Sequence, residues 1–175
     1  MGIASSTIVS RINLNSQPYA NIYNLINNRS NVPDPLGNIQ RKFVYTKVPD
    51  IEGREFKANS FPFIVVKKQR RGEKSNFTLD EKSAMVFGEI EVEVYSSNDM
   101  MGKHKDKGVS YLESISDDLE ETFNSASNKI ILRNYNMGDL NITLDDSDTI
   151  EMGTQTIFVN SFTISFGKRM VISAW

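Results

Sequence analysis

Three glutamates in the segment GEIEVEVY (88–95) are the residues whose type and spacing could most directly do chemistry. Clustered carboxylates act as general acids and bases or bind cations. The surrounding sequence supplies neither a partner base nor a set of metal ligands. The strict alternation with apolar residues instead predicts a strand with one dry face and one acidic face. The acidic face consists of Glu89, Glu91 and Glu93, and the dry face consists of Ile90, Val92 and Val94.

The strongest charge feature is a run of basic residues that follows the apolar segment FPFIVV. It comprises Lys67, Lys68, Arg70, Arg71 and Lys74. Such a run can contact phosphate groups or the carboxylates of a partner protein. It lacks the interleaved aromatic residues that stack on single-stranded nucleic acid. Three interpretations are open: an exposed hairpin tip, a contact with an acidic protein neighbour, and a contact with DNA.

Other potential sites have simpler interpretations. His104 lies between lysines and glycines without a residue to orient it, and is predicted to be a solvated loop histidine. Asp145, Asp146, Asp148 and Glu151 lack the central glycine and the final glutamate of a calcium loop, and are predicted to form a solvated turn. The chain contains no cysteine, which excludes disulfides, thiol catalysis and sulfur-ligated zinc. We therefore expect no enzymatic activity, no cofactor and no metal site.

The composition is typical of one globular domain. The chain has 175 residues, 39% of them hydrophobic, and a net charge of −2. This balance requires neither nucleic acid nor an acidic membrane as a partner. We see no run of about 18 apolar residues and no apolar core of a signal peptide. The expectation is a soluble, intracellularly made protein.

Two amphipathic helices are predicted from apolar residues at three- and four-residue spacing. The first covers Tyr19–Ile26. The second covers Tyr111–Ala126 and begins at a capping box formed by Ser110 and Glu113. The side chains expected to cover the strand of residues 84–95 are Leu119 and Phe123.

The remaining elements are strands. They are predicted over residues 43–48, 61–66, 84–95, 130–132, 140–144 and 157–166. Gly88 is a candidate bulge, and Gly167-Lys168 a candidate turn. Short connections favour antiparallel pairing. The predicted fold is therefore α+β: a mostly antiparallel sheet with two amphipathic helices packed on one face, in a single domain over residues 1–175. We expect a flexible N-terminal segment (about 1–16) and a long basic loop (67–83).

The order of these elements resembles that of the tail terminator (tail completion, head–tail joining) proteins of long-tailed phages and related viruses. The segments that carry the resemblance are residues 19–26, FVYTKV (43–48), FPFIVV (61–66), EIEVEVYS (89–96), LESISDDLEETFNSAS (112–127) and IFVNSFTISF (157–166). They cover most of the chain from about residue 17. The N-terminal extension and the long basic loop depart from the compact members of the family.

The resemblance implies a structural virion protein that forms a ring, usually a hexamer. Such a ring caps the tail tube, ends its polymerisation and joins the tail to the head. Its partners are further copies of itself, the tail tube protein, head–tail connector proteins, and genomic DNA that passes through the channel without specific binding. No membrane is involved, and the protein resides in the tail or neck of a virion assembled in the host cytoplasm.

In such a ring, residues 67–74 are candidate contacts to partners or subunits. The glutamates Glu89, Glu91 and Glu93 are candidates for a channel face that repels DNA, or for a solvent-facing or intersubunit face. Three alternatives remain open. One is a nucleic-acid-binding module that uses residues 67–74, and another is a different head–tail connector or tail tube component. The third is an enzyme whose site lies between subunits.

Overall fold

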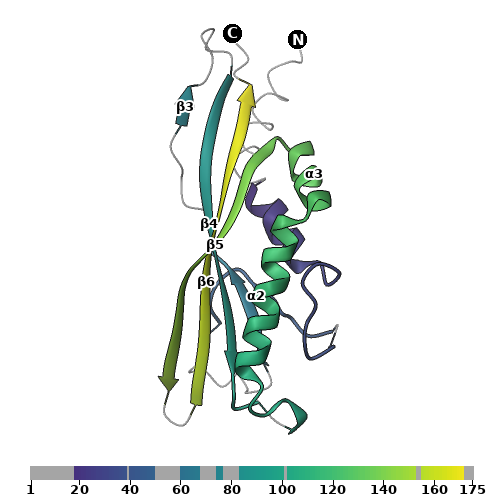
Figure 1. The fold of residues 1–175 in the computed structure, drawn as a ribbon, viewed down its shortest axis with the longest axis vertical. Coiled ribbons are helices and arrows are strands. Elements are labelled where there is room, and N and C mark those ends of the chain that lie inside the picture. Colours follow the sequence, from purple (N-terminus) through teal and green to yellow (C-terminus); the bar gives the residue numbers. More distant parts are fainter. Residues whose placement is uncertain are drawn as a thin grey trace, which may run out of the picture.

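The computed structural model of the chain describes residues 18–38, 40–49, 60–67, 74–76, 83–100, 102–152 and 155–171 (Figure 1). A helix over residues 18–27 comes first. It is followed by the strands β1 (Val44–Tyr45), β2 (Phe63–Val66), β3 (Lys74–Asn76) and β4 (Ser83–Ser97), the short helix η2 (Gly102–His104), the helices α2 (Gly108–Asn124) and α3 (Ala126–Asn134), and the strands β5 (Met137–Met152) and β6 (Gln155–Val171). The expectations for residues 1–16 and for most of the loop 67–83 lie outside the described residues.

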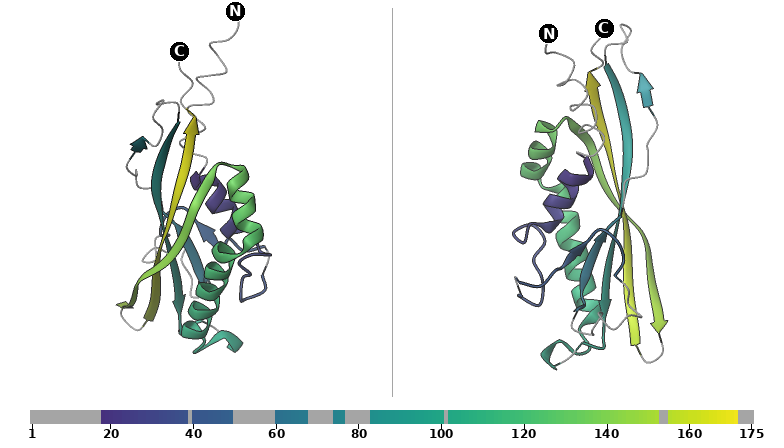
Figure 2. Two further views of the ribbon diagram at one scale, coloured as in Figure 1. Left: turned by 45° about the horizontal axis from the view of Figure 1, so that its top comes forward. Right: turned by 180° about the vertical axis from the view of Figure 1, so that it is seen from behind.

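The strands form one sheet in the order β1-β2-β4-β6-β5, with β3 paired to β4. Every described pair is antiparallel except β1–β2, which is parallel. The three longer helices lie on one face of this sheet (Figures 1 and 2). The α+β prediction is confirmed, although the sheet is mixed and the predicted pair of helices has become three. None of the helices in the described part of the chain is long and apolar enough to cross a membrane.

The main core lies between the helices and the sheet. The dry face of β4, formed by Ile90, Val92 and Val94, is fully buried there. Leu119 and Phe123 of α2 belong to the same apolar cluster, as the sequence predicted. Burying each such side chain contributes about 1.5–3 kcal/mol, so this layer supplies a large part of the folding free energy.

A second, smaller apolar cluster lies on the other face of the sheet. It consists of Phe61, Phe63, Val65, Tyr95, Met100, Ile157 and Val159. Strand β2 contributes side chains to both clusters: Ile64 and Val66 belong to the main core, and Phe63 and Val65 belong to the second cluster. The prediction that the FPFIVV segment is covered on both faces is therefore confirmed.

The segment between the first helix and β1 is fixed by one buried carboxylate. Asp34 accepts hydrogen bonds from the Arg41 guanidinium, and Arg29 lies 3.4 Å from the same carboxylate. Both guanidinium groups also stack on Phe43, at 4.7 and 5.3 Å from the ring centroid. Arg41 further donates to the Ser60 carbonyl at 2.8 Å. This cluster ties the chain before β1 to the chain before β2, which explains why the two strands meet side by side.

Two elements begin or continue differently from the sequence prediction. Helix α2 begins at Gly108, and its first N–H donates to the Asn98 side chain at 2.9 Å, so the predicted capping box at Ser110 is wrong. Residues 130–132 are not a strand, because they form part of α3 after a break at Ser125. At the start of α2, a contact with a residue outside the predicted capping box decides the structure.

Strands β4 and β6 are longer and more regular than predicted. Gly88 pairs with Phe166, and its neighbours continue the same register without a bulge. Gly167-Lys168 is not a turn either, since β6 runs on to Val171. The irregularities lie instead in β5, between Gly138 and Asn141 and between Leu144 and Asp146.

The two irregularities of β5 change which residues face the core. Asp139, at φ 49°, lies in the first of them. After it, Ile142 and Leu144 stand opposite the core residues Ile164 and Phe162. After the second, Ile150 stands opposite Ile157 of the other cluster. Each shift adds a residue on β5 and so inverts the inside–outside alternation. The predicted turn over residues 145–151 is therefore wrong, because these residues continue the strand.

Gly108 is the point at which α2 approaches the end of β4 most closely. A Cβ there would lie 2.6 Å from the Ser97 carbonyl carbon and 2.8 Å from the Asn98 backbone nitrogen. We expect Gly108→Ala to destabilise the fold by about 1–3 kcal/mol in urea unfolding, despite the higher helix propensity of alanine. Gly138→Ala is the matched control, since its Cβ would meet nothing within 4 Å. Equal midpoints for the two variants would contradict the close approach.

Candidate interaction surface

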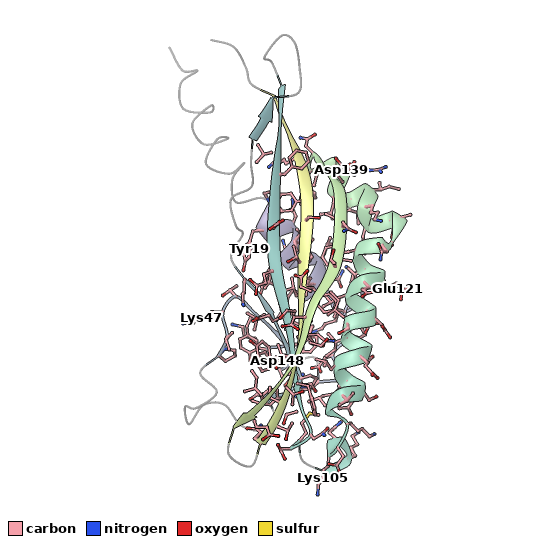
Figure 3. All side chains as sticks on the ribbon, turned by 60° about the vertical axis from the view of Figure 1, so that its left-hand side comes forward. Tyr19, Lys47, Lys105, Glu121, Asp139 and Asp148 are labelled. Carbon is pink, nitrogen blue, oxygen red and sulfur yellow. The ribbon has the colours of Figure 1, made fainter. Side chains whose placement is uncertain are left out.

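The sheet face opposite the helices is polar over most of β4, β6 and β5. We call this surface the open face, and it consists of Glu89, Glu91, Asn141, Thr143, Ser161, Thr163 and Ser165. These residues stand opposite one another across the three strands. No described helix lies on this side (Figures 1 and 3). Short hydroxyl side chains with a row of carboxylates form a surface suited to contact with water or another macromolecule.

The three predicted glutamates have three different environments. Glu89 is exposed, whereas the Glu91 side chain retains 26% and the Glu93 side chain 11% of its accessible surface. The row therefore descends from solvent into the second apolar cluster, where Glu93 stands opposite Val65. The predicted acidic face is therefore reduced to Glu89 and the partly exposed Glu91.

Lys67 joins the glutamate row to β2. Its ammonium lies 2.7 Å from Glu91 Oε1 and 2.6 Å from Glu93 Oε1. Its backbone N–H also donates to the Glu91 carbonyl at 2.8 Å. On the other side of Glu93, the Tyr95 hydroxyl donates to Oε2 at 2.8 Å. A carboxylate at this depth needs such partners, because an unpaired buried charge costs several kcal/mol.

This network shifts the pKa of two of its members. Burial opposes the charge on Lys67, but its hydrogen bonds to Glu91 and Glu93 outweigh burial and raise the Lys67 pKa. Burial raises the pKa of Tyr95, and the hydrogen bond to Glu93 raises it further. Both groups thus hold their protons more firmly in the folded chain than in an unfolded one.

The structure brings together two groups that the sequence presented separately. Lys67, the first residue of the basic run, is engaged by the acidic face itself. Lys74 lies in β3 and pairs through its backbone with Val86 of β4. Lys68, Arg70 and Arg71 lie outside the described residues, so their predicted role as partner contacts stays a prediction.

His104 is less solvated than the sequence indicated. It is half-buried, and its Nδ1 lies 2.7 Å from the Tyr111 hydroxyl of α2. The expectation of an unpartnered loop histidine is therefore wrong. The contact is with a phenol and not with a carboxylate, and it orients the imidazole ring. His104 acts here as a brace between η2 and α2.

The acidic residues of β5 are exposed along an edge strand. Asp145 lies in the second register shift, and Asp146, Asp148 and Glu151 lie in the part of β5 that follows it. Two of the carboxylates accept hydrogen bonds from the next backbone N–H, that of Ser147 at 2.9 Å and that of Thr149 at 2.7 Å. No group of three or more acidic, histidine or cysteine side chains in the described part of the chain could hold a metal ion.

Exposed apolar side chains on α3 are a surface feature that sequence reasoning missed. Ile130 is 57% exposed, and Ile131 and Tyr135 are also exposed. The run Ile130–Leu132 predicts a strand, so the sequence does not indicate an outward helix face here. In the helix Leu132 is buried, and the two isoleucines point to solvent.

No protein-family model and no curated protein matches the chain. Its function must therefore be inferred from its own fold and surface chemistry.

Removal of the Lys67 ammonium tests the network directly. Lys67→Met keeps the stem but leaves Glu93 with one hydrogen-bond partner fewer in a largely buried position. We expect a loss of about 1–2 kcal/mol in urea unfolding, less than for a deeply buried pair because the Lys67 side chain is 35% exposed. Lys47→Met, at an exposed position, is the control and should leave the midpoint unchanged. If Lys67→Met and the wild type unfold at the same urea midpoint, the ion pairs of Lys67 contribute nothing to the free energy of unfolding.

Alkaline unfolding provides an independent check. The folded-state pKa of Lys67 lies above its ordinary 10.5 and that of Tyr95 above its ordinary 10.0, so both contributions are complete below these values. They are lost as the pH rises through the raised folded-state values, because the unfolded chain releases its protons first. The free energy of unfolding should therefore fall above about pH 10, and the fall should be shallower in Tyr95→Phe than in the wild type. Parallel profiles would contradict the raised pKa of Tyr95.

Proposed function

We propose that the chain is a structural subunit of a viral tail, a tail-terminator-type protein that forms a ring, caps the tail tube and joins it to the head. The observation that carries this proposal is the long, exposed edge strand β5 beside a polar open face. A 16-residue edge strand that pairs with a described strand on one side alone offers a long surface on which a neighbouring chain can pack. In an assembly the same edge becomes a contact.

The element order supports the same function. A helix precedes the aromatic strand β1, the strands β2, β3 and β4 follow, and a helical layer and the two C-terminal strands β5 and β6 complete the fold. This is the order on which the resemblance to tail terminators rests. The described residues offer no metal cluster, and their one histidine contacts a phenol. A structural role makes no demand for catalytic groups.

Charge on the open face is compatible with DNA that passes without binding. Glu89 is exposed and Glu91 half-buried, while the hydroxyl side chains around them carry no positive charge. Carboxylates repel phosphate groups, so DNA beside such a surface slides more easily than it adheres. In the proposed ring this part of the sheet is the candidate channel face. Glu93 is turned into the second apolar cluster and contributes little to it.

The proposed ring is made of six copies and works with the tail tube protein and head–tail connector proteins in the neck of the virion. A different connector or tube component shares this chemistry and differs only in position along the tail. The nucleic-acid-binding alternative receives less support, because Lys67, one of the basic residues that it would use, is already paired with Glu91 and Glu93.

Electron microscopy of the purified chain tests the proposal. We expect closed rings with sixfold class averages and, by sedimentation velocity, a particle of about six times the chain mass of 19.8 kDa. Antibody labelling should place the chain at the head–tail junction of purified virions.

The contrary outcome is a chain that stays monomeric, is missing from virions, and binds duplex DNA with a steep salt dependence. In that case binding should disappear when Lys68, Arg70 and Arg71 are neutralised. It should persist in the control Lys42→Ala/Lys47→Ala, which removes charge from exposed positions elsewhere.

A further inference from the structure

We infer that copies of this chain associate head to tail, with the acidic half of β5 in one copy seated against a lysine-bearing turn of the next. The inference rests on the proposed function for ring closure, and it adds which two surfaces meet. The resemblance to tail terminators does not imply a contact at either of these surfaces. Both are built from exposed residues with complementary charge.

The first surface is the acidic edge, which we define as residues 144–151 of β5. It carries four carboxylates and no basic residue. It also exposes two apolar side chains, Leu144 at 46% and Ile150 at 38%. In the described sheet, β5 pairs with β6 on one side and with no strand on the other. Uncovered apolar groups beside like charges are expected of a surface that is covered in an assembly.

The second surface is the lysine turn, residues 102–109. Lys103, Lys105 and Lys107 are all exposed, and Val109 beside them is 44% exposed. Asp106 is the acidic residue within the turn, and Asp99 precedes it, so the lysines remain in excess. None of the three lysines forms an ion pair with another described residue.

The lysine turn is held in shape before any partner arrives. Asn98 accepts from the Asp106 N–H through its carbonyl at 3.1 Å and from the Gly108 N–H through its side chain at 2.9 Å. The His104–Tyr111 contact braces the same turn against α2. A preformed surface loses little conformational entropy on binding, which favours it as a docking element.

The two surfaces lie at the same end of the elongated molecule but on opposite sides of it. The end of β5 lies at one edge of the sheet, and the turn before α2 lies on the opposite side of the molecule, on the side of the helices (Figures 1 and 2). Figure 3 shows Lys105 at the tip below α2 and Asp148 higher up, where the strands cross in this view. Two different patches on opposite sides cannot satisfy each other within one copy. They can do so between successive copies, and such heterologous contacts close into a ring when the rotation permits.

Pairing of β5 with β5 of a second copy is disfavoured for two reasons. The carboxylates would face carboxylates, and two of the outward backbone donors of the acidic edge are already occupied. Following the ladder from Glu91, whose carbonyl accepts from β2, the N–H groups of Ser147 and Thr149 point away from β6. Each is bonded to the carboxylate of the aspartate before it. The contact therefore uses side chains and not an added strand.

Charge exchange between two variants tests the inference. The edge variant Asp146→Lys/Asp148→Lys carries basic groups on both surfaces, and the turn variant Lys103→Glu/Lys105→Glu carries acidic groups on both. Each alone should lose self-association by about tenfold or more, because like charges meet. An equal mixture should recover it, since every edge then meets a turn of opposite charge in an alternating assembly. Mass photometry and sedimentation velocity at about 50 mM and 500 mM salt measure the effect, which screening should weaken.

The control variant Asp117→Lys/Glu121→Lys makes the same charge change on the exposed side of α2 and should assemble as the wild type does. Circular dichroism and urea unfolding verify that each variant is folded. If both charge variants assemble as the wild type does, or if the mixture does not recover, the inference is overturned while rings of the wild type still support the proposed function. If the mixture recovers but the chain is missing from virions, the inference stands and the proposed function falls. A wild type that is monomeric at every concentration overturns the inference.

Discussion

The structure depends on one constraint: strand β4 lies between two apolar clusters, but only one of its faces is apolar. Ile90, Val92 and Val94 satisfy the helix side without further help. On the other side, Glu93 and Tyr95 are buried, so a carboxylate and a phenol must be satisfied beside Phe63 and Val65. Lys67 and the Tyr95 hydroxyl supply those hydrogen bonds. Because Lys67 directly follows β2, this network also fixes where β2 ends along β4.

The same constraint explains why the open face divides into a dry and a wet part. Near Glu93 and Tyr95 the sheet needs apolar neighbours, which β2 and the first residues of β6 provide. Toward Glu89 the cover ends, and the residues opposite are Ser165 and Asn141, which tolerate solvent. The register shifts of β5 follow this division. They direct Ile142 to the main core, and Ile150 to the side of the second cluster, along one strand.

Much of the fold could be predicted from periodicity, because the relevant burial is local and regular. The alternation in β4 and β6 and the spacing in α2 mark the residues that form the main core. Prediction failed at both ends of α2. Asn98, which precedes the helix by ten residues, caps it in place of Ser110, and a break at Ser125 separates it from α3. In β5 the alternation is inverted twice, so no single period describes the strand.

The sequence predicts which charged residues contribute to the candidate surface, but it does not predict how they are arranged relative to one another. The sequence marked Lys67 and the glutamate row as opposite charges but gave no register between β2 and β4. A shift of one residue would have turned the glutamates to the other face. It also marked the acids of residues 145–151, but as a turn, because a strand made of aspartate and serine contradicts local propensity. Their strand conformation follows from pairing with β6, whose apolar residues are strongly patterned.

The carboxylates on β5 protect the edge strand against pairing with other strands, and the same carboxylates can select a basic partner surface. An unpaired edge strand must avoid indiscriminate pairing, and carboxylates that repel their own kind and occupy outward N–H groups achieve this. The same carboxylates can accept a basic surface, and the chain carries one on its opposite side. In the contact that we propose, such an edge rejects a second edge and admits a turn, so that association between copies has a direction. Direction is what a closed ring requires, because each copy must present a different surface to each of its two neighbours.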